Sequence, residues 1–340
     1  MNTLRCRPLN LRWRRDPTKF RTLVVQGMIL VTIVIPTFRR PALLTAAIES
    51  CQQQSPAATE SCEILVVDNS PEGSARGIVE MLAVRSLTKL RYVHEARSGI
   101  ARARNTGVAA ASGRFIAFLD DDEVAAPGWL ASLLRHAANG GKAVFGPVQP
   151  SFETGVNAIS ASAIRLFKRA LPVSDGADIS RMNAFLGAGN SLFEKATCFL
   201  SDAPFTTELD GLGGEDSDFI FHLVQRGVAL IWAADAIVTE FVPNDRMASR
   251  YLELRSLRNG QIRSLVQFRA KGQHIFAGLC WMAVGLAQTG LFGLAGLTLA
   301  PFSPNTAADY RLRAMSGLGK MFWMPFFWPR SYPSNSATAN

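Results

Sequence analysis

The sequence predicts an α/β fold built on a central, mostly parallel sheet flanked by helices, and three observations support this. From residue 29 onward, short β-branched runs alternate with helical patterns, which is typical of parallel β-α-β units. The first run, 29–35, is apolar except for Thr32, as expected for a strand covered on both faces. Polar residues follow three of the first four strands, at the sheet edge where open α/β folds bind ligands.

Each element is predicted from its own local pattern. A helix begins at Pro41, because Leu44, Ala47 and Ile48 recur at helical spacing. A dense turn signal follows the second strand, and a Gly-rich turn precedes the helix that begins at Glu215. The predicted strands are 29–35, 63–67, 90–93, 114–119, 143–148, 185–193, 228–233 and 236–241, and the further helices are 75–84, 100–111, 158–169 and 247–270.

The charge of the chain is uneven. Residues 1–27 hold seven basic side chains against one acid, so this segment contributes six of the nine net positive charges among 340 residues. No recognition motif accompanies these charges, and we therefore expect a disordered extension and no nucleic-acid partner. Met28 directly precedes the first strand and is an alternative translation start.

A long uncharged segment, 275–302, predicts membrane contact near the carboxyl end. Its 28 residues are enough to cross a bilayer core of about 30 Å at about 1.5 Å per residue. The aromatic run 321–328 suits the membrane interface. Spanning, re-entrant and interfacial arrangements all fit, and the alternative is a buried helical hairpin broken at Thr289-Gly290.

Asp120, Asp121 and Asp122 stand at the carboxyl end of the fourth predicted strand. Three adjacent carboxylates repel one another unless a cation lies among them, and carboxylate oxygens suit Mg²⁺ or Mn²⁺ shared with phosphates. Asp120 and Asp122 therefore form a candidate metal site for a nucleotide diphosphate, with an acidic surface turn as the alternative.

Two other polar clusters carry weaker signals. Asp68-Asn69 after the second strand can bind a ribose or base, although the pair also simply makes turns. Glu215 and Asp216 begin a helix, where acids stabilise the helix dipole without any further role. The glycines before them let backbone approach a ligand closely.

Five motifs in order resemble those of family 2 glycosyltransferases, over residues 28 to 258. The L-D-D-D-E and G-G-E-D-x-D-F forms are most similar to bacterial exopolysaccharide glucosyltransferases of the succinoglycan-assembly type. The motifs are I-V-I-P-T-F-R-R-P at 33–41, V-V-D-N-S at 66–70, S-G-I-A-R-A-R-N-T-G at 98–107, F-L-D-D-D-E at 118–123 with P-G-W-L at 127–130, and G-G-E-D-S-D-F at 213–219.

The resemblance implies a GT-A nucleotide-sugar-binding domain over 28–245, and the composition after it predicts a helical membrane-associated region over 246–330 and a tail over 331–340. It also implies roles for individual residues. Pro36, Thr37, Arg39, Asp68, Asn69, Arg104, Asn105, Asp120 and Asp121 would bind the nucleotide, Asp120 and Asp122 the metal, and Asn190 and Glu215 the acceptor, while Asp216 would be the general base with Glu215 beside it.

One position departs from the resemblance. Relatives often carry a histidine near Val238 that completes the metal shell, whereas this chain has Thr239 followed by Glu240. Three arrangements stay open: Glu240 substitutes, water fills the position, or Asp122 and phosphate hold the metal.

The expected function is inverting transfer of a sugar, most simply a hexose, from a UDP-sugar to a polyprenyl-diphosphate-linked saccharide. The resemblance implies Mn²⁺ or Mg²⁺ as cofactor and the cytoplasmic face of the bacterial inner membrane as location. A carboxylate-pair glycoside hydrolase and a catalytically silent binding protein are the alternatives. A P-loop is absent, and no G-x-G-x-x-G follows the first strand, which argues against P-loop NTPases and Rossmann dehydrogenases.

Overall fold

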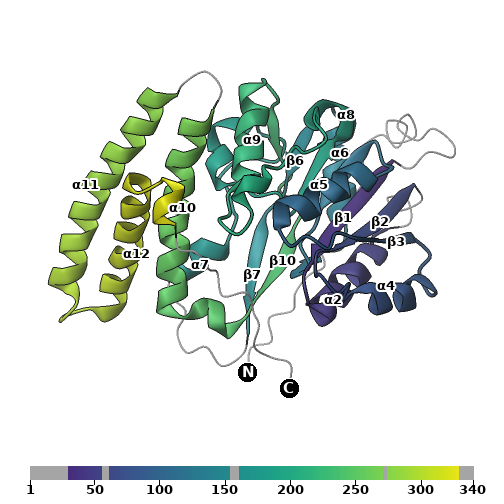
Figure 1. The fold of residues 1–340 in the computed structure, drawn as a ribbon, viewed down its shortest axis with the longest axis horizontal. Coiled ribbons are helices and arrows are strands. Elements are labelled where there is room, and N and C mark those ends of the chain that lie inside the picture. The colour runs from purple at the N-terminus through teal and green to yellow at the C-terminus, as the bar shows by residue number, and fades with distance from the viewer. Residues whose placement is uncertain (1–29, 56–60, 154–160, 271–273, 329–340) are drawn as a thin grey trace, which may run out of the picture.

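The computed structural model describes residues 30–55, 61–153, 161–270 and 274–328. An α/β body lies beside a bundle formed by the last three long helices (Figure 1). The main sheet has seven strands in the order β3-β2-β1-β4-β8-β6-β9, and a smaller sheet has the order β5-β10-β7. The predicted extension over 1–27 and the tail over 331–340 lie outside the described residues.

The amino-terminal half of the main sheet is parallel, which confirms the prediction. Alternate residues of β1 face opposite layers: Ile33 packs in the cluster that includes α2, and Val34 packs in the cluster that includes α5. The register pairs Thr37 with Asp68, so both strands end at the same edge. The elements are β1 (Val31–Thr37), α2 (Pro41–Gln52), β2 (Cys62–Asp68), α4 (Arg76–Ala83), β3 (Lys89–His94), α5 (Ile100–Ala110) and β4 (Phe115–Phe118).

The second half of the sheet contains one reversed strand, β8, which runs antiparallel to both β4 and β6. The small sheet lies at the carboxyl edge, because β5 directly follows the acidic turn after β4. The elements are β5 (Glu123–Ala125), α6 (Trp129–Ala138), β6 (Ala143–Phe145), β7 (Val148–Phe152), α7 (Ala161–Phe167), η1 (Ser180–Phe185), β8 (Ser191–Glu194), α8 (Lys195–Cys198), η2 (Thr207–Leu209), α9 (Glu215–Gln225), β9 (Leu230–Trp232) and β10 (Val238–Val242).

The predicted strand over 185–193 is wrong in its first half, because the chain becomes a strand only at Ser191. Asn190 has φ +49°, a left-handed conformation that a strand cannot contain. The buried Arg169 guanidinium donates to the carbonyls of Gly187, Gly189 and Asn190 at 2.7–3.0 Å. The carbonyls of Gly187 and Gly189 are therefore bound by a side chain, and that of Asn190 is shared between this side chain and the Gly146 amide at 3.2 Å.

The carboxyl-terminal helices pack closely on one another. Glycines allow the approach: a Cβ on Gly285 would meet the carbonyl oxygen of Gly317, and one on Gly319 would meet that of Leu257. The alternative hairpin broken at Thr289-Gly290 is wrong, because one helix runs through both residues. The elements are η3 (Asn244–Met247), α10 (Ser249–Arg269), α11 (Ile275–Leu299), α12 (Pro304–Met321) and η4 (Pro325–Phe327).

Candidate active site

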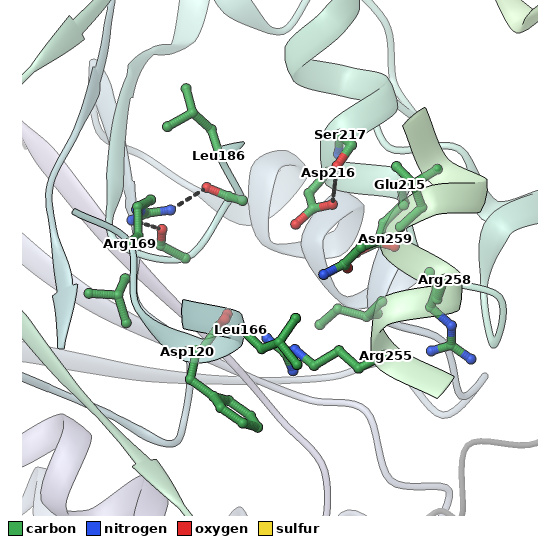
Figure 2. A pocket seen from close by; sticks show the side chains of 18 of the residues that line it. Asp120, Leu166, Arg169, Leu186, Glu215, Asp216, Ser217, Arg255, Arg258 and Asn259 are labelled. Atoms are coloured by element: carbon green, nitrogen blue, oxygen red, sulfur yellow. Dashed lines mark hydrogen bonds between the residues drawn. The ribbon is translucent and has the colours of Figure 1, made fainter. Parts of the chain in front are cut away.

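A cavity of about 2110 Å³ opens at the carboxyl edge of β1 and β4 and continues to α10, α11 and α12. Figure 2 shows Asp120, Glu215 and Asp216 facing this space, with Arg255, Arg258 and Asn259 of α10 along one wall. This is the sheet edge at which open α/β folds bind ligands. Polar residues that follow β1, β2 and β4 thus meet in one site, with Asn69 but not Asp68 in its lining.

The acidic turn after β4 is held by basic and hydroxyl side chains. Thr37 Oγ1 donates to Asp121 Oδ2 at 2.8 Å, and Arg40 Nη1 lies 3.1 Å from both Asp121 Oδ1 and Asp122 Oδ2. Arg246 Nη1 donates to Asp122 Oδ2 at 3.2 Å. Burial raises the pKa of Asp121 to about 6, although Arg40 opposes that shift. The structure therefore neutralises this turn with arginines from two distant segments.

Arg104 joins the two acidic parts of the site. Its guanidinium, carried by α5 and buried, lies 2.5 Å from Glu215 Oε1 and 3.5 Å from Asp120 Oδ1. Burial and the adjacent Asp216 raise the pKa of Glu215 to about 7, and Arg104 opposes this shift. Burial likewise raises the pKa of Asp120. One cation thus links the acidic turn to the start of α9.

Asp216 faces the cavity from the first turn of α9. Gly213 and Gly214 precede that helix with φ +84° and +97°, conformations that favour glycine. Asp216 Oδ1 accepts a hydrogen bond from the Ser217 amide at 2.7 Å, which leaves Oδ2 on the cavity side. Gly187 lies against Oδ2, where a Cβ would approach to 3.0 Å. The carboxylate is therefore fixed at one oxygen and accessible at the other.

The residues predicted for the uridine pocket gather at one end of the cavity. Pro36, Thr37, Arg39 and Asn69 all line it. Arg39 has φ +55° and donates from Nε to Glu72 Oε1 at 2.6 Å. The Asn69 side-chain amide ties together the chain at 95–99, through hydrogen bonds of 2.6–2.9 Å to backbone atoms.

Asp68 lies behind this pocket and does not line the cavity. It is buried, and its carboxylate accepts hydrogen bonds from the amides of Ser70 (3.0 Å) and Ala75 (2.6 Å) and from Tyr92 Oη (3.1 Å). These contacts fix the turn between β2 and α4. Its predicted contact with uracil or ribose stays a prediction.

Asn105 and Asn190 also lie outside the cavity lining. Asn105 exchanges both side-chain hydrogen bonds with the backbone of Phe205, at 2.8 and 2.9 Å. Asn190 accepts from Trp129 Nε1 at 2.8 Å and donates to two backbone carbonyls at 2.7 and 2.8 Å. Both amides are thus engaged in supporting neighbouring loops, and their nucleotide and acceptor contacts stay predictions.

On β10, Glu240 lines the cavity and Thr239 does not. Arg246 Nη1 lies 3.5 Å from Glu240 Oε1 and bridges it to Asp122. Burial and Asp122 raise the pKa of Glu240 to about 7. Glu240 and Asp122 thus share one arginine, and the three arrangements considered for the metal shell stay predictions.

The donor set fits a divalent cation only if the cation shares its coordination with substrate. Among the residues that the structure describes, no three His, Cys, Asp or Glu side chains form a group able to hold an ion. Asp120 and Asp122 supply carboxylate oxygens, and Mg²⁺ commonly takes one or two carboxylates with phosphates and water. The protein thus offers part of a metal shell open towards the cavity.

Sequence reasoning missed several residues that shape the site. Arg169 gave no local signal, because it binds carbonyls far along the chain. Arg40 belongs to the motif at 33–41 but was assigned no role, and Arg246 was not singled out. The cavity wall formed by α10 could have been predicted from the sequence, because its lining residues recur at helical spacing within a basic segment. These residues are Tyr251, Arg255, Arg258, Asn259, Ile262 and Arg263.

A parallel sheet whose carboxyl edge carries an acidic D-x-D turn beside a large cavity is typical of α/β enzymes that bind nucleotides. A family model described as glycosyl transferase family 2 matches residues 32–190. The succinoglycan biosynthesis protein ExoM of Rhizobium meliloti is 32% identical over 232 residues, which are 68% of this chain and 73% of that protein. The chain therefore belongs to glycosyl transferase family 2.

Three further comparisons agree. The GalNAc(5)-diNAcBac-PP-undecaprenol beta-1,3-glucosyltransferase of Campylobacter jejuni is 32% identical over 118 residues, 34% of this chain and 37% of that protein. The mannosyltransferase PcManGT of Pyrobaculum calidifontis, solved with GDP-Man and Mn²⁺, superposes with a TM-score of 0.58 at 17% identity, covering 88% of each chain. S. aureus TarS 1–349 superposes at 0.50 and 15% identity, covering 85% of this chain and 90% of that one. The predicted GT-A fold and glycosyltransferase class are confirmed.

Proposed function

We propose that the protein transfers a sugar from a UDP-sugar to the hydroxyl of a lipid-linked saccharide, with inversion at the anomeric carbon. The observation that carries the proposal is that Asp216 faces the same cavity as the acidic turn at Asp120–Asp122. A donor diphosphate at the turn and an acceptor hydroxyl at Asp216 would place the anomeric carbon between them. The names of the similar bacterial proteins support a role in exopolysaccharide or other cell-surface glycan synthesis.

Asp216 would remove the proton of the acceptor hydroxyl as the hydroxyl oxygen attacks the anomeric carbon. The bond to the diphosphate oxygen breaks on the opposite face, so an α-linked donor gives a β-linked product. A general base must reach the proton that it removes, and Oδ2 of Asp216 is turned towards the cavity. Glu215, bonded to Arg104, would contact the acceptor beside it.

Asp120 and Asp122 are the residues that would hold Mn²⁺ or Mg²⁺, and Glu240 lines the same cavity. A bound divalent ion supplies Lewis-acid stabilisation of the diphosphate leaving group. Arg40 and Arg246 already contact Asp122 and would exchange part of that contact for the diphosphate. Pro36, Thr37, Arg39 and Asn69 would surround the uridine.

UDP release across a panel of nucleotide sugars tests the donor and the metal together. With acceptor-containing membranes, one UDP-sugar is expected to react, and chelation should lower its rate by at least about tenfold, since the ion supplies several kcal/mol. Asp122→Asn should mimic chelation, whereas the exposed Asp235→Asn serves as the matched control. Metal-independent release of free sugar without acceptor would instead indicate a hydrolase.

Membrane contact is proposed along the outer face of α11. This helix is long and apolar enough to cross a bilayer, and only 11% of its most apolar 18-residue stretch is buried. Its neighbour α12 packs along it, with Tyr310 stacked on Phe292 at 5.6 Å, yet carries Asp309, Arg311 and Arg313. If α11 spanned the membrane, these charges would enter the hydrocarbon at high cost. We therefore infer an interfacial position on the cytoplasmic face.

The double substitution Leu291→Glu and Leu294→Glu should weaken membrane binding. Both leucines are exposed on α11, at 67% and 66%. We expect at least about a tenfold drop in co-sedimentation with phosphatidylglycerol vesicles, because each buried leucine contributes about 1.5–3 kcal/mol. Leu87→Glu makes the same change at an exposed leucine distant from α11 and should have no effect. Equal vesicle binding by the double variant and the wild type would rule out this membrane face.

A further inference from the structure

The active-site cavity extends beyond Asp216 to the junction of α10, α11 and α12. Its far end is lined by Arg263 of α10, Trp281 and Gln288 of α11, and Ser316 and Lys320 of α12. The bundle that forms this end lies beside the α/β body (Figure 1). The far end therefore connects the catalytic carboxylates to the apolar helix proposed to touch the membrane.

Two cations face this end of the cavity, and neither has a carboxylate partner among the described residues. The Arg263 guanidinium lies 4.6 Å from the Phe185 ring centroid and 5.6 Å from that of Trp281. Lys320 Nζ donates to Gln288 Oε1 at 2.8 Å and contacts Ser316 Oγ at 3.2 Å. The cavity arginines nearer the acidic turn differ, since Arg104 and Arg246 both bind carboxylates.

Placing these two like charges together is costly without an anion. Burial and the neighbouring Arg263 lower the pKa of Lys320 to about 8. Burial also lowers the pKa of Arg263. Desolvated cations of the same sign destabilise a fold unless an opposite charge compensates them. An anionic ligand between them would supply that charge.

The donor groups at this position match a phosphate ester. A guanidinium that stacks on aromatic rings uses its faces, so its in-plane N–H donors stay directed outwards. Such a planar fork binds phosphate oxygens in pairs, and an ammonium group adds a compact charge. The two cations therefore match the spread charge of a diphosphate better than that of a single carboxylate.

The far end is distinct from the predicted site of the donor diphosphate. Arg255 interacts electrostatically with Glu240 near the acidic turn, and Arg263 lies eight residues farther along α10, about 12 Å at helical rise. Gly214, just before the catalytic pair, packs against Ile262. An anion at Arg263 would therefore lie beyond Asp216 from the acidic turn, on the side left for the acceptor.

We propose that Arg263 and Lys320 bind the diphosphate of a prenyl-diphosphate-linked acceptor, whose lipid chain leaves along the apolar face of α11. The proposal rests on the proposed function, and it identifies the residues that recognise the acceptor. The same cationic pair also suits a phospholipid headgroup, which shares the phosphate chemistry, and the test separates these two sources.

The test measures binding of farnesyl diphosphate to the full chain in detergent, with UDP present at saturation to occupy the donor site. Farnesol is the uncharged comparison. We expect Arg263→Gln and Lys320→Gln each to weaken farnesyl diphosphate binding by about tenfold, the size of one lost charge-assisted hydrogen bond. Arg263→Lys should retain most of the affinity. Arg311→Gln, an exposed change on α12 outside the cavity, should behave as wild type.

Unchanged farnesyl diphosphate affinity in both glutamine variants would overturn the proposal, as would equal binding of farnesol. If the two glutamine variants lost binding to phosphatidylglycerol vesicles but kept their farnesyl diphosphate affinity, the cationic pair would bind phospholipid headgroups. That result would also overturn the proposal. UDP affinity is measured in the same samples: it should be unaffected by Arg263→Gln. Failure of every sample to bind UDP would contradict the proposed function, while a diphosphate effect confined to the Arg263 and Lys320 variants would still support this inference.

Discussion

Asp216→Asn is expected to abolish sugar transfer while leaving UDP binding intact. The substitution keeps the size of the side chain and the hydrogen bond from the Ser217 amide, but removes the group able to accept a proton. General-base catalysis typically contributes about 10²–10⁴-fold to the rate, so kcat should fall by at least that range. Transfer is measured as UDP release that depends on acceptor, and UDP affinity by calorimetry.

Asp235→Asn provides the matched control, since this carboxylate is 73% exposed and pairs only at the surface with Arg135. Its kcat should equal that of the wild type. A near-normal turnover rate for Asp216→Asn would contradict the assignment of Asp216 as the general base. A variant that lost UDP affinity as well would show that Asp216 acts on the donor.

Arg104→Met should cost about 3–5 kcal/mol of unfolding free energy and most of the activity. Breaking a buried ion pair from one side leaves its partner charge uncompensated, which is the source of that cost. Here two carboxylates, Glu215 and Asp120, would be left beside each other without the guanidinium. Urea unfolding measures the stability change.

Two comparisons make this second prediction specific. Arg76→Met breaks a surface ion pair with Glu80 at 3.9 Å and should cost no more than about 1 kcal/mol. Adding Glu215→Gln to Arg104→Met removes one of the stranded charges and should recover part of the lost stability. A loss below about 1 kcal/mol for Arg104→Met would mean that Arg104 does not link the two acidic parts.

The parts of the fold that could be predicted are those with a strong local signal. The buried runs of β1, β2 and β4 read as apolar segments, and the helices between them follow a 3.6-residue period. The reversed strand β8 and the short strand β5 depend on pairing between distant segments, which no local pattern reveals. The loop at 187–190 was misread because the Arg169 side chain binds its carbonyls, a long-range contact that no local pattern reveals.

The candidate site likewise contains residues that the sequence could predict and residues that it could not. The position of Asp120, Asp122 and Asp216 at the cavity could be predicted from the sequence. Each stands at the end of a strand or the start of a helix, and such ends meet at one sheet edge. Asp68, Asn105 and Asn190 carry polar groups that look available in sequence, yet their hydrogen bonds are made within the fold. Whether a side chain faces the ligand depends on such tertiary contacts.

The configuration of the new glycosidic bond tests the central claim most directly. The product of the UDP-release reaction would be isolated and its anomeric proton coupling measured by NMR. A single displacement with Asp216 as base predicts a β-linked product from the α-linked donor. An α-linked product would contradict that mechanism, and free sugar as the main product would contradict transfer itself.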